Sequence, residues 1–290
     1  MPRTIDEGFR DFLSRLTPTD SESAAASSHR ASIEACLKDN FGLRRFARIG
    51  SFGNGTSISG YSDVDYLASI PGDKLSSNSD YSLRKIREAL DARFPNTGVR
   101  VDCPAVCVPF GGTAADRTEV VPAHYIGDER DRKVYDIADC AGGWMRASPD
   151  AHNAYVADVD GRLGGKVKPL VRFIKAWKYF CNVPVSSFYL ELRVAKYAEG
   201  EKAIIYDMDV KRVLKLLSDV GLADMQDPMG VSGLIRACKT ADQRTDALSK
   251  LGTALGRAEK ARAAAEASNV SEAFDWWRLV YNYEFPTYYY

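Results

Sequence analysis

The spacing of apolar residues changes near residue 160, and this change restricts the fold class more than any other feature of the chain. Beyond that point apolar residues recur almost everywhere at the interval of a helix. The helices predicted there cover 165–181, 186–199, 208–220, 230–238, 241–267 and 271–282. Before residue 160 helical and strand-like segments are mixed. We therefore expect an α+β half, residues 1–160, followed by a helical half, residues 161–290.

The first half contains both kinds of segment. Helical spacing predicts one helix that ends before Pro18, a second that runs through Ala25, Ile33 and Leu37, and a third over 81–94. Short apolar stretches broken by Gly, Ser and Asn are typical of strands joined by turns. The predicted strands lie within 47–70, 99–110 and 118–126.

Charge and hydropathy restrict the class of partner. The 39 basic and 39 acidic side chains cancel, whereas a protein that grips long nucleic acid usually carries a basic excess. This balance favours a small substrate over long nucleic acid. The amino terminus lacks an apolar signal segment, and no apolar run approaches the roughly 20 residues that span a bilayer. We expect a soluble, cytoplasmic protein without a membrane partner.

The six cysteines do not form a recognisable metal motif. The only close pair, Cys103 and Cys107, lies in a predicted strand and has no second pair or His cluster at zinc-ligand spacing. We therefore expect buried, reduced thiols.

The chemistry of the chain is concentrated in Gly50-Ser51 and in Ser62-Asp63-Val64-Asp65. Residues two apart on a strand point to the same face, so Asp63 and Asp65 are expected side by side. Two neighbouring carboxylates repel each other unless a cation lies between them. Mg²⁺ is the cation that uses a few carboxylates and completes its shell with water and phosphate oxygens. The Gly50-Ser51 turn can present backbone N–H groups and a hydroxyl to a triphosphate.

A second metal ion requires a third carboxylate. Two ions about 3.5–4 Å apart can stabilise both the entering and the leaving oxygen of a phosphoryl displacement. Asp102 and Glu119 are the candidates, because each interrupts an apolar strand, where an acidic residue is costly unless it is exposed, paired or bound to metal.

These segments resemble a known family. Gly50-Ser51, Gly55-Thr56 and Ser62-Asp63-x-Asp65 match the signature of polymerase-β-like nucleotidyltransferases, and nearly the whole chain resembles the bacterial cGAS/DncV-like nucleotidyltransferases (CD-NTases). Four further segments carry this closer resemblance. They are Thr118-Glu119-Val120-Val121-Pro122-Ala123, Phe173-Ile174-Lys175-Ala176-Trp177 with Ser186-Ser187-Phe188-Tyr189-Leu190-Glu191, Asp227-Pro228, and Trp276-Trp277 to Phe285-Pro286.

The resemblance implies roles for individual residues. It favours Glu119 over Asp102 as the third metal ligand, although many members carry Asp at this position. It assigns Lys175 and Ser187 to the nucleotide triphosphate and Phe188 to stacking on the base. From the residues alone, the alternatives are that Lys175 is a solvated helix lysine and that Phe188 is a core residue. Other basic residues near Lys175 compete for its role, namely Lys166, Lys168, Arg172 and Lys178.

The resemblance also implies a fold and a function. The fold is a polymerase-β-like core, a mixed sheet with flanking helices, in residues 1–160 with bracing amino-terminal helices. A helical substrate-binding domain follows in 161–290, with the substrate cleft between the two. The function is synthesis of a cyclic oligonucleotide from nucleoside triphosphates, ATP and GTP, with two Mg²⁺ ions or Mn²⁺ in their place. A purine cyclic dinucleotide such as cyclic GMP–AMP would activate a separate effector protein in antiphage signalling.

Two alternatives remain open from the sequence. A nucleotidyltransferase could modify another acceptor, such as an RNA end, a small molecule or a protein. A non-catalytic nucleotide sensor could use the same fold, but such sensors usually lose carboxylates.

Overall fold

The computed structural model describes residues 2–21, 24, 29–112 and 116–289. Contacts between Cα atoms divide the chain into two compact units. The sheet unit comprises 18–154 and 229–233, and the helical unit comprises 1–17, 155–228 and 234–290. These units are defined by contacts between Cα atoms, and the predicted domain boundary at residue 160 remains a prediction.

The sheet unit is built around a seven-stranded mixed sheet in which β1, β2, β5, β4 and β3 are neighbours in that order. β5 also pairs with β6, and β6 pairs with β7. The strands are β1 (Arg45–Ile49), β2 (Val64–Ser69), β3 (Arg100–Asp102), β4 (Ala105–Pro109), β5 (Arg117–Glu129), β6 (Arg132–Ala138) and β7 (Trp144–Ala147). Among the described strands of this sheet, β2 and β5 run parallel and the other pairs run antiparallel, so the predicted mixed sheet is confirmed.

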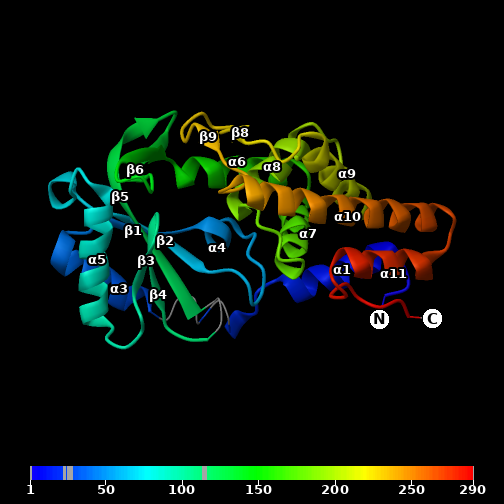
Figure 1. Cartoon of the computed structure of the whole chain (residues 1–290), viewed down its shortest axis with the longest axis horizontal. Helices are drawn as coiled ribbons and strands as arrows, with labels where there is room; N and C mark the ends of the chain where they lie inside the picture. Colours follow the sequence, from blue (N-terminus) through cyan, green and yellow to red (C-terminus); the bar gives the residue numbers. More distant parts are fainter. Residues whose placement is uncertain (1, 22–23, 25–28, 113–115, 290) are drawn as a thin grey trace. The chain divides into compact units, whose positions relative to one another are not determined.

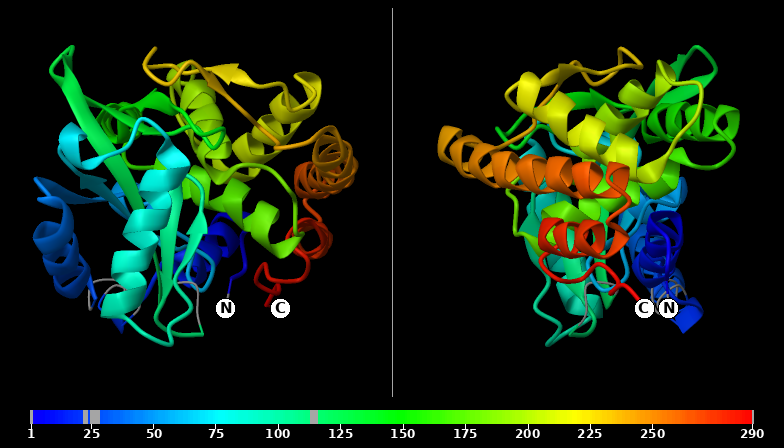
Figure 2. Two further views of the ribbon diagram at one scale, coloured as in Figure 1. Left: turned by 60° about the vertical axis from the view of Figure 1, so that its left-hand side comes forward. Right: turned by 90° about the vertical axis from the view of Figure 1, so that its right-hand side faces the viewer.

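Helices cover one face of this sheet (Figures 1 and 2). Side chains of successive strand residues point to opposite faces, and Val64, Tyr66 and Val120 are buried against the helices α3 (Arg30–Phe41) and α5 (Ser79–Arg93). The alternation therefore directs Asp65 of β2 and Glu119 of β5 to the opposite face, which we call the carboxylate face. Two short helices complete this unit, α4 (Gly50–Asn54) and η1 (Gly72–Lys74), and α6 (Pro149–Arg162) runs from it into the helical unit. Ala25 of the predicted second helix lies outside the described residues.

The helical unit confirms most of the helices predicted from periodicity. It contains α1 (Ile5–Leu16), α7 (Val167–Phe180), α8 (Ser187–Glu199), α9 (Tyr206–Asp219), α10 (Ala241–Glu266) and α11 (Val270–Val280). The helix predicted over 230–238 is wrong. Leu234–Ile235 forms the strand β9, which pairs with β8 (Met225–Gln226), because Gly230 and Gly233 adopt positive φ angles of 71° and 67° that end any helix.

Aromatic rings from both ends of the chain form the core of the helical unit. Phe9 of α1 lies 5.0 Å from Phe173, 5.1 Å from Trp277 and 5.1 Å from Phe285, measured between ring centroids. The termini meet beside this core, where the Tyr289 N–H donates to the Pro2 carbonyl at 3.1 Å (Figure 1). Helix α1 is therefore part of the helical unit.

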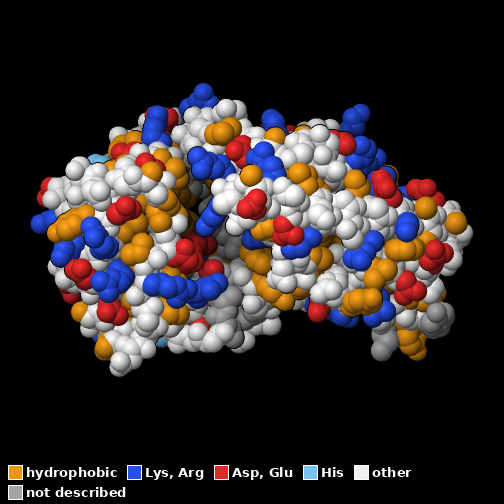
Figure 3. All heavy atoms as spheres, in the orientation of Figure 1, with side chains coloured by type: hydrophobic (Ala, Val, Ile, Leu, Met, Phe, Trp, Pro, Cys, Tyr) orange, Lys and Arg blue, Asp and Glu red, His pale blue; other side chains and the backbone are white. Residues whose placement is uncertain are grey.

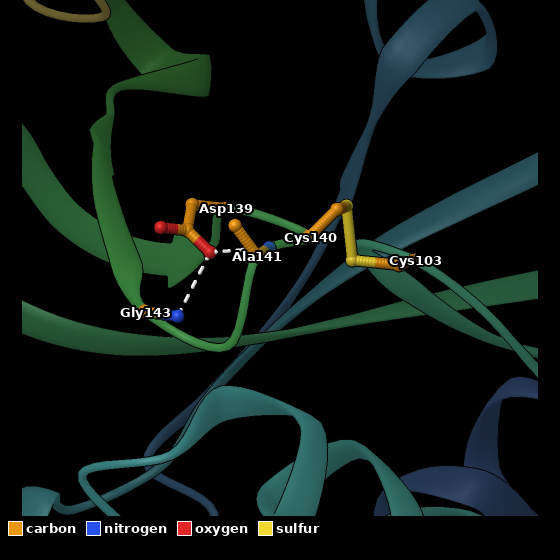
Figure 4. The surroundings of a disulfide bond; sticks show 5 residues. All are labelled: Cys103, Asp139, Cys140, Ala141 and Gly143. Atoms are coloured by element: carbon orange, nitrogen blue, oxygen red, sulfur yellow. Dashed lines mark hydrogen bonds between the residues drawn. A yellow bond between two sulfur atoms is a disulfide. The ribbon is translucent and has the colours of Figure 1, made fainter.

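The prediction of reduced cysteines is wrong for two of the six. Cys103 and Cys140 form a disulfide between the β3–β4 turn and the loop after β6 (Figure 4). The sheet brings these segments to a Cα separation of 5.7 Å although they are 37 residues apart, which sequence spacing could not indicate. Cys36, Cys107, Cys181 and Cys238 are free thiols. Among the described residues, no helix is both long and apolar enough to cross a membrane.

Candidate functional site

The parallel pairing of β2 and β5 sets the position of two of the predicted carboxylates. Asp65 and Glu119 are register partners, so their side chains leave neighbouring strands on the same face, about 4.8 Å apart at the backbone. Asp63 precedes Asp65 by two residues and lies on the same side. The structure thus brings Asp63, Asp65 and Glu119 together on the carboxylate face.

Asp102, the other candidate for the third carboxylate, lies farther away. It pairs with Ala105 of β4, and β4 separates β3 from β5. Glu119 is adjacent to Asp65 whereas Asp102 is two strands from Glu119. The geometry therefore supports Glu119 as the third member of the group.

The charges around Glu119 are strongly interdependent. Burial raises the pKa of Glu119 most, and the negative charges of Asp63 and Asp102 raise it further. Arg117 and a hydrogen bond with Asp65 lower it, without reversing the direction. Burial is thus the main cause, and the repulsion from the neighbouring acidic groups, which adds to it, is of the kind that a bound cation relieves.

Asp63 has a partner that the sequence did not indicate. Arg117 Nε donates a hydrogen bond to Asp63 Oδ1 at 2.6 Å, and Arg117 Nη2 also contacts this oxygen. Within the described residues, no three His, Cys, Asp or Glu side chains are already arranged as a metal centre. The three carboxylates still supply the oxygen donors that Mg²⁺ requires, and their shared face and crowding fit a divalent cation. In this arrangement Asp63 Oδ1 is hydrogen-bonded to Arg117.

Gly50 is required for the approach of α4 to the carboxylates. It follows β1 with a φ of 60°, and a Cβ atom at this position would lie 2.0 Å from Asp65 Oδ2. Only glycine leaves room for the carboxylate here. Ser51 follows Gly50 in the same short helix, and the binding of phosphate by these two residues remains a prediction.

Cys107 is buried beside Glu119 in the sheet. It is the register partner of Glu119 on β4, and Arg100 of β3 is the next residue in the same row. Burial raises the pKa of the Cys107 thiol to about 11, so at neutral pH it is a protonated, unreactive side chain. Arg117 could have been suspected from the sequence, because it lies two residues before Glu119 and residues of one strand that differ by two share a face. The place of Cys107 depends on the pairing of β4 with β5, which local sequence does not indicate.

The residues predicted in the helical unit fall into two environments. Lys175 is only 1% exposed, and its Nζ lies 3.7 Å from Glu191 Oε2. Ser187 instead accepts a hydrogen bond from Lys178 Nζ at 2.5 Å and lies 3.2 Å from the Tyr179 hydroxyl. Phe188 is 42% exposed, so it is a surface side chain and not the core residue of the alternative interpretation.

Comparison with known proteins relates the first 160 residues to a defined family. Residues 3–160 match the model of the Second Messenger Oligonucleotide or Dinucleotide Synthetase domain. The chain is 29% identical over 180 residues to the CBASS oligonucleotide cyclase CdnC of Escherichia coli (strain KTE188), a match that covers 56% of this chain and 53% of the relative. The chain thus matches about half the length of the curated relatives.

The fold has close counterparts among solved structures. The structure of E. coli MS115-1 CdnC with ATP superimposes with a TM-score of 0.75 at 18% identity and covers 97% of this chain and 98% of that one. The complex of CdnC with HORMA-deltaN gives a TM-score of 0.74 at 17% identity, with the same coverage. At these identities the likeness concerns the fold.

Proposed function

The chain belongs to the Second Messenger Oligonucleotide or Dinucleotide Synthetase family, and from this membership we propose that it joins nucleoside triphosphates into a cyclic oligonucleotide. The proposed substrates are ATP and GTP, and the proposed product is a purine cyclic dinucleotide such as cyclic GMP–AMP. The name of the related E. coli protein, an oligonucleotide cyclase, supports this reaction. The structural observation that carries the proposal is the register of Asp65 with Glu119, which gathers three carboxylates on one face.

We propose that Asp63, Asp65 and Glu119 hold two Mg²⁺ ions, for which Mn²⁺ can substitute. When bound, Mg²⁺ would offset the charge of the triphosphate and make the attacking hydroxyl more acidic. Carboxylate oxygens are the donors that this ion prefers. Asp63 would have to exchange its contact with Arg117 for this role.

The proposed reaction is a displacement at phosphorus. A ribose hydroxyl oxygen forms a bond to the α-phosphorus of the second nucleotide, and the bond from that phosphorus to the β-phosphate oxygen breaks. Pyrophosphate leaves with the electron pair. The hydroxyl proton goes to a carboxylate oxygen of Glu119, which acts as the general base. A second displacement of the same kind closes the ring.

The nucleotide contacts remain proposals. Gly50 and Ser51 would bind phosphate oxygens beside Asp65, and Phe188 would stack on a base, a contact worth about 1–3 kcal/mol. Ser187 would contact the triphosphate. The family resemblance gives Lys175 the same role, but its burial beside Glu191 makes Lys178, which already contacts Ser187, the better candidate.

The biological role proposed is antiphage signalling, in which the cyclic product activates a separate effector protein. The related cyclase is a CBASS protein, which supports this role. E. coli CdnC has also been solved in complex with HORMA-deltaN. We propose that this chain likewise has a protein partner besides its effector.

One incubation tests the reaction. The full chain is mixed with the four labelled triphosphates and Mg²⁺, and the products are separated after phosphatase treatment. A cyclic product survives phosphatase, and we expect one from the wild-type chain. Label that remains on RNA, a small molecule or a protein would instead identify a transferase with another acceptor. If no triphosphate is consumed, the chain is not a synthase.

Two sets of variants link the activity to the site. The double substitution Asp63→Asn, Asp65→Asn should abolish synthesis and leave the metal-free melting temperature no lower than that of wild type, because it removes charge without changing volume. Glu119→Gln should slow turnover at least tenfold more than Asp102→Asn, a difference of about 1.4 kcal/mol in the barrier. A larger effect of Asp102→Asn would show that the third carboxylate is misassigned.

A further inference from the structure

Arg117 is in direct contact with one of the proposed metal ligands. It begins β5, and Glu119 lies two residues later, so both side chains project from the carboxylate face. Two nitrogen atoms of its guanidinium contact one oxygen, Asp63 Oδ1. This arrangement places a fixed positive charge on the carboxylate that stands first in the Asp-x-Asp motif.

This contact competes with a cation for the same oxygen. A guanidinium is planar, permanently charged and offers several N–H donors, so it can neutralise a carboxylate much as a metal ion does. A carboxylate oxygen that is bonded to two guanidinium nitrogens has little space or remaining charge for a divalent ion. Arg117 and a metal ion at Asp63 Oδ1 therefore exclude each other.

We infer that Arg117 is a positioning residue that sets the metal affinity of the site: it holds Asp63 while the metal is absent and leaves Oδ1 when the metal binds. This inference rests on the proposed function, because it assumes that Asp63 is a metal ligand. In the metal-free chain Arg117 limits the repulsion among Asp63, Asp65 and Glu119, and it makes cation binding depend on breaking one ion pair.

The environment of the pair suits a contact that must open. The Arg117 and Asp63 side chains are 37% and 24% exposed, so neither is locked inside the core. Partly exposed ion pairs contribute little to stability, because water screens them and competes for their atoms. The backbone of β5 is fixed at this point by the next residue, Thr118, which is buried. The guanidinium can therefore move away while its backbone stays in the sheet.

Arg100 provides a matched comparison. It lies on the carboxylate face in the same row as Glu119, separated from it by Cys107. It carries the same charge and is exposed, but Asp63 is bonded to Arg117. If positive charge on this face were all that mattered, the two arginines would have similar effects on metal binding. If the direct contact matters, only Arg117 will have a large effect.

The test measures Mn²⁺ binding to the full chain without nucleotide, by calorimetry and by the loss of the free-ion electron paramagnetic resonance signal. Arg117→Gln should lower the dissociation constant for Mn²⁺ by about threefold to tenfold, the range expected for removal of one partly exposed ion pair. Arg100→Gln should change it less than twofold. Arg117→Lys, which keeps the charge but lacks the planar donor pair, should lie between wild type and Arg117→Gln.

A second measurement follows the arginine directly. In ¹⁵N-labelled protein, the Arg117 Nε–H resonance, identified by its loss in Arg117→Gln, should shift on addition of Mg²⁺. A residue with only a structural role would keep its resonance and leave the metal affinity unchanged. An unchanged or weaker Mn²⁺ affinity in Arg117→Gln, together with an unshifted resonance, would overturn the inference.

The outcome is distinguishable from failure of the proposed function. If wild type binds Mn²⁺ and Asp63→Asn does not, the metal site stands whatever Arg117 does. If wild type and Asp63→Asn bind Mn²⁺ equally, the metal role of Asp63 is wrong, and the inference falls with it.

Discussion

Gly50 and Asp65 illustrate how one residue type can determine the geometry of a site. Gly50 has a positive φ, and a Cβ atom added to it would lie 2.0 Å from Asp65 Oδ2, so glycine is required for two separate reasons. The first concerns the backbone alone. The second concerns the carboxylate, because any side chain at residue 50 must displace Asp65 from its present position.

Gly50→Ala should therefore reduce synthesis at least tenfold, since Asp65 can no longer keep its place beside Glu119. Backbone strain adds about 1–2 kcal/mol of destabilisation. Gly98→Ala is the matched control, because Gly98 has a φ of 77° and open space around it. Both variants should melt earlier than wild type, but only Gly50→Ala should lose activity. Equal activity of the two variants would contradict the close approach seen in the structure.

The helices α7 and α8 show how neighbouring lysines on one element can have different roles. Lys175 points into the helical unit, where Glu191 of α8 is its partner, and Lys178 lies one turn later and donates to Ser187 at the start of α8. The helical repeat of 3.6 residues places residues three apart on nearby but distinct parts of the surface. Here the difference separates a buried ammonium group from one at the helix surface.

We predict that Lys175→Ala chiefly lowers stability, by about 3–5 kcal/mol, because it leaves the buried Glu191 carboxylate without this cation. Lys178→Ala should keep a near-wild-type melting temperature and weaken triphosphate binding by about 1.5–3 kcal/mol, the range for a charge-assisted hydrogen bond. Thermal melts and nucleotide titration with Mg²⁺ on both variants decide between them. If Lys175→Ala folds normally and binds triphosphate more weakly than Lys178→Ala, the assignment returns to Lys175.

The β3–β4 turn and the loop after β6 are joined by the Cys103–Cys140 disulfide (Figure 4). The loop is ordered by Asp139 as well, whose Oδ1 accepts hydrogen bonds from Ala141 N at 2.7 Å and Gly143 N at 2.9 Å. The cross-link closes a segment that contains β4, β5 and β6, and therefore Glu119. Loss of the bond should increase the conformational freedom of this segment in the unfolded chain and change the folded structure much less.

Reduction by a dithiol should accordingly lower the melting temperature. For a closed loop of 37 residues the lost restraint is worth about 4 kcal/mol, or a decrease of about 7 °C for a chain of 290 residues. The Cys140→Ser variant should melt at the same lower temperature, and the dithiol should have no further effect on it. Alkylation of the denatured wild-type chain should label four of the six cysteines. Six labelled cysteines in protein isolated without reductant would show that the bond does not form.

At the scale of the whole chain, opposite charges balance. The 39 basic and 39 acidic side chains give no net charge, and both kinds are interspersed on the face shown in Figure 3. Binding to long nucleic acid depends mainly on basic side chains that neutralise phosphates. A balanced chain has little of this attraction at physiological salt, whatever small anions its site binds.

We expect a 40-base-pair DNA duplex or RNA of similar length to bind with a dissociation constant weaker than about 10 µM in 0.15 M salt. Gel retardation measures this directly, and the rate of nucleotide synthesis with and without nucleic acid provides a second measurement. Tight, salt-sensitive binding or a large increase in rate would reveal a local basic surface that the net charge conceals.

Local pattern in the amino-acid sequence is sufficient to predict the mixed α/β segment, five of the six later helices, and the common face of Asp63 and Asp65. These features depend on the repeat of a single strand or helix, which neighbouring residues specify. Gly230 and Gly233 are also visible in the sequence, but the prediction of a helix over 230–238 considered apolar spacing alone. It is wrong because both glycines adopt positive φ angles and the segment forms a strand.

Other features depend on pairings between distant segments, which only the folded chain establishes. Glu119 lies beside Asp65 because β2 and β5 pair in one register, and a slip of one residue would have turned Glu119 to the opposite face. The Cys103–Cys140 bond, the hold of Arg117 on Asp63 and the burial of Lys175 arise in the same way. Each joins residues whose proximity follows from packing and register, and no local repeat encodes it.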